Sequence, residues 1–122
     1  MSVTSVSLLG PDLVTRTLAT ALDGLSLRQN VIANNIANVD TPNFRATSVD
    51  FESSLASALA DGDPEDTVIS STPTQTPVGA NGNNVDQRKE TMAAMQTVYQ
   101  YQVLTRATSD RFDLLKTASA AF

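Results

Sequence analysis

The side chains of this chain that could take part in catalysis are mainly carboxylates. Its 122 residues include no histidine and no cysteine, the residue types that most often serve as general bases, nucleophiles and transition-metal ligands. Asp50 and Glu52 come nearest to an acid–base pair, but acidic residues at the start of a helix are stabilised there by the helix dipole, which explains both. We therefore expect no catalytic residue, no enzymatic activity and no bound cofactor.

The acidic segment from Asp61 to Asp66 raises the question of a calcium site. A calcium-binding EF-hand loop needs glycine at its sixth position and a bidentate glutamate at its twelfth. Counted from Asp61, those positions hold Asp66 and Thr72. The pattern therefore predicts a solvated turn and no metal site.

The overall charge and hydropathy exclude two further classes of partner. The formal net charge is −5, which opposes the electrostatic attraction that draws proteins to nucleic acid. The segment 1–10 has no basic residue and so lacks the pattern of a secretory signal peptide. No stretch approaches the roughly 20 apolar residues of a membrane-spanning helix. We expect no nucleic-acid partner, no membrane span and no cleaved signal.

Asparagines crowd into a segment that otherwise has the pattern of a helix. Asn30, Asn34, Asn35 and Asn38 fall within nine positions, and each costs up to roughly 0.7 kcal/mol relative to alanine in a helix. Residues 30, 34 and 38 recur every four positions and form a ridge beside the apolar stripe. Capping and turn formation explain Asn38 but not the two residues upstream. We therefore hypothesise that the ridge contacts a partner.

Apolar residues from Leu18 to Val39 predict the helix that carries these asparagines. Their alternating 4,3 spacing is typical of a coiled-coil seam. Pro11 and Asp12 suit a first helical turn, and the helix is placed at 11–39. The seam positions are Leu18, Leu22, Leu25, Gln29, Ile32, Ile36 and Val39.

The middle of the chain is predicted to be rich in loops. The segment 40–50 is expected to be a turn followed by extended chain, because Pro42 and Asn43 fit the central pair of a β-turn. A short helix at 51–60 follows, with Asp50 as its N-cap. Three prolines and three glycines in 61–84 predict a long flexible loop, in which only 67–69 could form a brief strand.

A second long helix is predicted at 85–120, where Asn84 and Gln87 match a capping box. Its apolar residues do not fall on one stripe. Met92 and Met95 are interpreted as core residues, and Tyr99 and Tyr101 as packing residues. One 4,3 register comprises Val98, Tyr101, Thr105, Thr108, Phe112, Leu115 and Phe122.

These elements predict a mainly α fold in one domain, 1–122. The long N- and C-terminal helices would pair in a coiled-coil-like hairpin, and the loop-rich middle would carry a short helix and little strand. Two helices alone bury too little surface to be securely stable at this size. Part of the core is therefore expected to come from other chains.

The segment Asn34-Asn35-Ile36-Ala37-Asn38-Val39-Asp40-Thr41-Pro42-Asn43-Phe44-Arg45 resembles the N-terminal signature of bacterial flagellar rod and hook proteins. The resemblance extends to Val49-Asp50-Phe51 and to the run 82–86, Gly-Asn-Asn-Val-Asp, and it covers about 18–60 and 82–118. The match is closest to the short proximal-rod members. Where the family commonly has glycine before the aromatic residue, this chain has Asn43, which also tolerates the left-handed conformation.

The resemblance implies a structural subunit of the flagellar basal-body rod. Such a subunit is synthesised in the cytoplasm, exported without a cleaved signal by the flagellar type III secretion apparatus, and assembled into the rod that spans the periplasm. Its implied partners are adjacent rod proteins, the basal-body components on the MS-ring and export-gate side, and the export apparatus. The alternatives are the other short proximal-rod protein or a free-standing helical adaptor.

The residues expected to make assembly contacts lie in the asparagine segment, in the turn after it and on the last helix. They are Asn30, Asn34, Asn35, Ile36, Asn38, Asp40, Thr41, Pro42, Asn43, Phe44, Leu104, Phe112 and Leu115.

Overall fold

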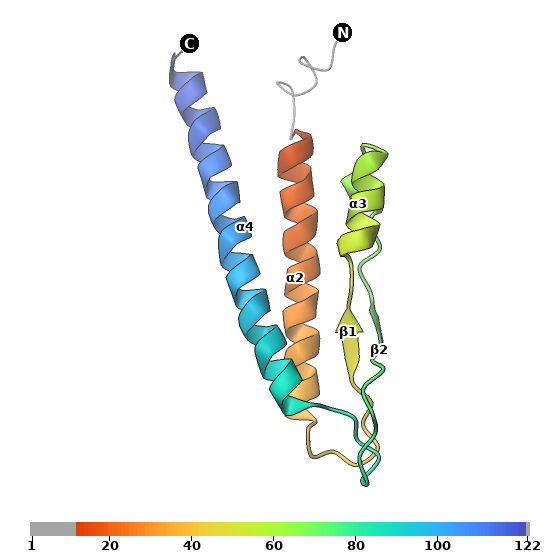
Figure 1. The fold of residues 1–122 in the computed structure, drawn as a ribbon. Coiled ribbons are helices and arrows are strands. Elements are labelled where there is room, and N and C mark those ends of the chain that lie inside the picture. Colours follow the sequence, from red (N-terminus) through yellow and green to blue (C-terminus); the bar gives the residue numbers. More distant parts are fainter. Residues whose placement is uncertain (1–11, 122) are drawn as a thin grey trace.

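The computed structural model describes residues 12–121 as a hairpin of two long helices with a thin ribbon-like arm packed beside it (Figure 1). The elements follow in the order α2 (Leu13–Ala37), β1 (Thr47–Val49), α3 (Glu52–Ala60), η1 (Pro64–Asp66), β2 (Ser71–Pro73) and α4 (Gln87–Ala121). The predicted mainly α fold, with long helices toward both ends, is confirmed.

The ends of α2 follow from local chemistry. The carboxylate of Asp12 caps the helix by accepting a hydrogen bond of 2.8 Å from the backbone N–H of Thr15. The last helical residue is Ala37, and Asn38 is the C-cap, so the helix is slightly shorter than the predicted 11–39. The proposed role of Pro11 lies outside the described residues.

Helix α2 is the central element, with α4 on one side and the arm formed by β1, β2 and α3 on the other (Figure 1). The arm approaches α2 at a notch made by Gly24. The aromatic ring of Phe51 fills this notch so closely that a Cβ atom at Gly24 would lie 2.6 Å from it. Arg28 covers the same ring, with its guanidinium carbon 4.9 Å from the ring centroid. Phe51 joins Ala21, Leu25 and Val49 in the buried core cluster.

Strands β1 and β2 pair antiparallel, with Thr47 opposite Pro73 and Val49 opposite Ser71. The extended chain expected before residue 50 is therefore confirmed at β1. The prediction of a strand at 67–69 is wrong, because β1 pairs with the later segment Ser71–Pro73. Only the pairing partner identifies the second strand, since Ser71–Pro73 has weak intrinsic strand preference.

Two charged clamps hold the arm against α2. Arg28 donates to both carboxylate oxygens of Glu52 at 2.7 and 2.8 Å and to the carbonyl of Val49. Arg16 donates to both carboxylate oxygens of Glu65 at 2.6 and 2.8 Å. The acidic run that was predicted to be a solvated turn is thus a docking point for α2.

The start of α3 differs from the prediction. Phe51, and not Asp50, precedes the first helical residue, and no side chain caps this end. Instead the carboxylate of Glu52 accepts a hydrogen bond from the backbone N–H of Phe51 at 3.2 Å. Asp50 is exposed and takes no part in the cap.

Helix α4 packs on α2 through small and polar residues. Its fully buried side chain is Thr97, which is 1% exposed and donates its hydroxyl to the carbonyl of Ala93 in its own helix. Leu104 packs against the core cluster, and Arg111 pairs with Asp12 at the far end of the seam. The predicted register through Phe112 and Leu115 does not face α2, since both residues are exposed.

Apart from Leu104, the large apolar side chains of α4 are exposed. Met92, Met95 and Tyr99 are 66%, 68% and 66% exposed, and Tyr101 is also exposed. Their interpretation as core and packing residues of the single chain is wrong. The apolar pattern could not distinguish a face buried within the chain from one left open, because both have the same helical period.

We predict that Gly24→Ala destabilises the chain by displacing Phe51. Overpacking costs roughly 1–3 kcal/mol, which exceeds the gain of about 1 kcal/mol from alanine in a helix. Thermal unfolding followed by circular dichroism should therefore show a lower midpoint. Ser26→Ala, at an exposed position of the same helix, is the control and should leave the midpoint unchanged or raise it. A midpoint of Gly24→Ala equal to that of the control would contradict the notch.

Candidate functional site

The asparagine segment divides into side chains that hold the fold and side chains that stay exposed. Asn35 is fully buried. Its amide donates to the carbonyl of Thr47 at 2.7 Å and accepts from the N–H of the same residue at 3.3 Å. One side chain therefore supplies both hydrogen bonds that a neighbouring strand would give to β1. The expectation that Asn35 contacts a partner is corrected, because its amide is used within the chain.

Asn38 closes α2 by local hydrogen bonds. Its side-chain amide donates to the carbonyl of Asn34 at 2.8 Å, and its side-chain oxygen accepts from the hydroxyl of Thr41 at 3.0 Å. This is the capping role that asparagine commonly takes at helix ends. Asn38 is partly buried, so it contributes less outward surface than the ridge hypothesis required.

The turn after α2 has the predicted geometry. The N–H of Phe44 bonds to the carbonyl of Thr41 at 3.3 Å, which places Pro42 and Asn43 at the two central positions. Asn43 has a φ of 64°, the left-handed conformation required at the third position of a type II turn. Gly82 lies directly against it, and a Cβ atom there would fall 2.2 Å from the side-chain oxygen of Asn43.

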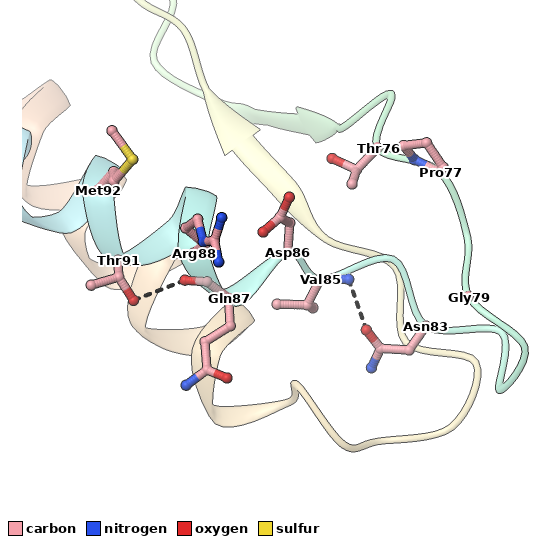
Figure 2. A pocket seen from close by; sticks show the side chains of 10 residues that line it. All are labelled: Thr76, Pro77, Gly79, Asn83, Val85, Asp86, Gln87, Arg88, Thr91 and Met92. Carbon is pink, nitrogen blue, oxygen red and sulfur yellow. Dashed lines mark hydrogen bonds between the residues drawn. The ribbon is translucent and has the colours of Figure 1, made fainter.

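Two asparagines from the start of the last segment pin this turn, and the sequence analysis missed them. The buried amide of Asn83 donates to the carbonyls of Asn38 and Thr41 at 2.8 and 2.7 Å, and its oxygen accepts from the N–H of Val85 at 2.7 Å, as Figure 2 shows. The oxygen of Asn84 accepts from the N–H of Ala46 at 2.6 Å.

The capping box predicted at Asn84 and Gln87 is wrong. Asp86 fills the capping role, since its carboxylate accepts a hydrogen bond from the N–H of Lys89 at 3.1 Å. Asn84 is instead buried, and its amide nitrogen donates to the carbonyl of Thr76 at 3.2 Å. The run from Gly82 to Asp86 was noted as part of the resemblance, but a buried asparagine and a capping asparagine have the same appearance in sequence.

An open hollow of about 1000 Å³ lies between the loop that precedes α4 and the first turns of that helix (Figure 2). Thr76, Pro77 and Asn83 line it from the loop side, and Arg88 and Met92 line it from the helix side. Its two ionic side chains, Asp86 and Arg88, do not form a cluster suited to acid–base chemistry. Asp86 is already engaged as a helix cap.

The ion pairs of Arg16 and Arg28 join α2 to the arm. The Arg28 guanidinium, by its hydrogen bonds, lowers the pKa of Glu52, which keeps this carboxylate ionised rather than poised to exchange a proton. Arg16 likewise lowers the pKa of Glu65 to about 2. Within residues 12–121, no three His, Cys, Asp or Glu side chains gather closely enough to hold a metal ion. No helix there is long and apolar enough to cross a membrane.

The remaining predicted contact residues lie on outward surfaces. Asn30, Asn34 and the turn residues Asp40, Thr41, Pro42 and Asn43 are exposed, and Ile36 and Phe44 are partly buried. On α4, Leu104 is used internally, whereas Phe112 and Leu115 are exposed beyond Arg111. The structure thus brings the turn residues together. The C-terminal part of α4, to which Phe112 and Leu115 belong, lies at the opposite end of the hairpin (Figure 1).

We predict that Asn83→Asp destabilises the fold by about 2 kcal/mol, because the carbonyls of Asn38 and Thr41 lose their donor in a buried site. The added carboxylate would also face two carbonyl oxygens. Urea unfolding should show a lower midpoint with an unchanged slope. Asn30→Asp makes the same substitution at an exposed position and should have little effect. Equal unfolding midpoints for the two variants would refute the pinning role.

Comparison with known proteins gives consistent results. Residues 16–45 match the sequence model of a family described as "Flagella basal body rod protein". The chain is similar to the flagellar basal body rod protein FlgB of Bacillus subtilis, with 36% identity over 115 residues that cover 82% of this chain and 88% of that protein.

Similar proteins occur in distant bacteria. The FlgB protein of Borreliella burgdorferi is 34% identical over 113 residues, covering 75% of this chain and 84% of that protein. The FlgB protein of Escherichia coli is 32% identical over 110 residues, covering 73% of this chain and 80% of that protein. The matched family region contains most of α2 and the whole turn that Asn83 pins.

Proposed function

This chain belongs to the flagellar basal body rod protein family, and from that premise we propose that it is a structural subunit of the proximal part of the rod. In this role its terminal helices pack among those of neighbouring axial proteins and transmit torque. The family is named for a structural component of the flagellum and not for a reaction. The proposed partners are adjacent rod subunits and the basal-body components on the MS-ring and export-gate side.

The observation that carries this proposal is that α4 leaves most of its large apolar side chains exposed. Its side toward α2 contains the buried Thr97, small residues and one large apolar residue, Leu104, whereas Met92, Met95 and Tyr99 are about two-thirds exposed. Contiguous exposed apolar side chains indicate an interaction surface. A helix that leaves most of its large apolar side chains outside the chain is suited to packing among other subunits.

We also propose that the chain reaches the rod through the flagellar export apparatus without a cleaved signal. The family membership supports this route, because rod subunits function outside the cytoplasm. The absence of cysteine is compatible with export as an unfolded chain, since no disulfide can hold the chain folded before export. The resulting location is the part of the basal body that spans the periplasm.

Adding charge to the outward side of α4 tests the assembly role. We predict that Met95→Lys with Tyr99→Lys leaves the helix content of the purified chain unchanged, because both residues are exposed, but abolishes swimming in a strain whose own gene is deleted. Isolated basal bodies should lack the rod. Val68→Lys with Val78→Lys changes two exposed apolar residues outside the long helices and should support swimming. Normal rods with the α4 variant would overturn the proposal.

The exposed asparagines of α2 give a second test. We predict that Asn30→Ala with Asn34→Ala raises or preserves helicity, because alanine is the better helix former by up to roughly 0.7 kcal/mol per site, and yet impairs swimming. The paired substitution Ser53→Ala and Ser57→Ala, also at exposed helical positions, is the control. If the asparagine variant swims as well as the control, these amides make no assembly contact.

A further inference from the structure

Two exposed helix faces of this chain have complementary size and charge. The outer face of α4 is a 4,3 stripe of exposed residues directed away from α2, and the open face of α2 is a 3,4 stripe directed away from α4 and the arm. The outer face comprises Arg88, Met92, Met95, Tyr99, Gln102 and Arg106. The open face comprises Asp23, Ser26, Asn30, Ala33, Ala37 and, in the turn after the helix, Asp40.

Each stripe has charges at both ends and uncharged residues between them. The outer face ends in Arg88 and Arg106, and the open face ends in Asp23 and Asp40. None of these four charges takes part in the ion pairs formed among residues 12–121. At about 1.5 Å per residue, the stripes are about 27 and 26 Å long, so both pairs of opposite charges can meet at once.

The side chains between the charges are also complementary. The outer face presents large groups, Met92, Met95 and Tyr99, and the open face presents small ones, of which Ala33 and Ala37 are the smallest. Two helices pack closely when the large residues of one helix lie opposite small residues of the other. The amide of Asn30 falls opposite Tyr99 in this register, and Ser26 falls opposite Gln102.

We propose that the outer face of α4 docks on the open face of α2 in a second copy of this chain. Helices α2 and α4 run in opposite directions (Figure 1), so two copies placed side by side in the same orientation present these faces antiparallel and at the same height. Arg88 then meets Asp40, and Arg106 meets Asp23. The inference deepens the proposed rod function by naming which surfaces of neighbouring subunits meet.

Charge also disfavours the symmetric alternatives. If two outer faces packed together antiparallel, Arg88 of each copy would lie opposite Arg106 of the other, and parallel packing would also bring arginine against arginine. Two open faces would bring aspartate against aspartate in the same way. Like charges across an interface select against such pairings. The contact is therefore heterologous, joining different surfaces of the two copies.

Cross-linking of two singly substituted chains tests this contact, because the natural chain has no cysteine. Full-length Ser26→Cys and Gln102→Cys chains, distinguished by a tag, are mixed at high concentration with a short thiol-specific cross-linker. The mixed dimer should predominate over both homodimers. Ala107→Cys, exposed and about 140° around α4 from Gln102, replaces Gln102→Cys in the control and should give little mixed dimer.

Charge reversal makes the test specific to the proposed register. Arg88→Glu with Arg106→Glu in the Gln102→Cys chain should lower the yield of mixed dimer about fivefold or more. Asp23→Arg with Asp40→Arg in the Ser26→Cys chain should restore it. A predominant Gln102→Cys homodimer, a yield no higher than the Ala107→Cys control, or failure of the second reversal to rescue would each overturn the inference.

These outcomes are separable from the rod function itself. If cross-linking fails while the natural chain still restores swimming and rod assembly, the contact is wrong and the rod proposal stands. If the mixed dimer forms but the chain is absent from isolated basal bodies, the contact stands and the rod proposal falls.

Discussion

The buried backbone groups of the loop-rich middle must all be hydrogen-bonded, and this requirement governs the rest of the structure. A two-stranded ribbon is not stable in water by itself. Here β1 has β2 on one edge, while Asn35 and Arg28 from α2 bond to the backbone of Thr47 and Val49. Helix side chains thus stand in for a third strand and fix the arm to α2.

The same requirement explains how the turn at the end of the hairpin keeps its shape. The carbonyls of Asn38 and Thr41 converge on one amide, that of Asn83, and the N–H of Ala46 finds its acceptor in Asn84. Because these donors and acceptors come from segments about 40 residues apart in sequence, the bonds hold the turn against the loop that precedes α4. The asparagines therefore couple the arm to the hairpin.

Sequence was sufficient wherever the cause of a structure was local. Asp12 at the start of α2 and the turn through Asn43 were predictable, because capping and the left-handed conformation depend on the residue itself and its neighbours. The buried role of Asn35 was not predictable, because its partner Thr47 lies beyond the turn and an asparagine in a helix gives no indication of which surface will cover it. The strand at Ser71–Pro73 was missed for the same reason.

The orientation of α4 was the hardest feature to predict. Its large apolar residues and its small residues alternate around the helix, and either side could have packed on α2. The core cluster takes its large side chains mainly from α2 and the arm, and Leu104 is the contribution of α4. The rest of the surface that α4 turns to α2 is small or polar, with Thr97 fully buried.

The difference between the side of α4 that packs on α2 and the exposed apolar side determines how the chain can assemble. A subunit that buried all its large apolar residues internally would gain little free energy by associating with another chain. With Met92, Met95 and Tyr99 outside, burial of apolar surface rewards contact with another chain. A heterologous contact leaves each new subunit with one face used and the complementary face free, so addition can continue along a ring or helix. The incomplete packing of the single chain and the capacity for extended assembly then have one physical origin.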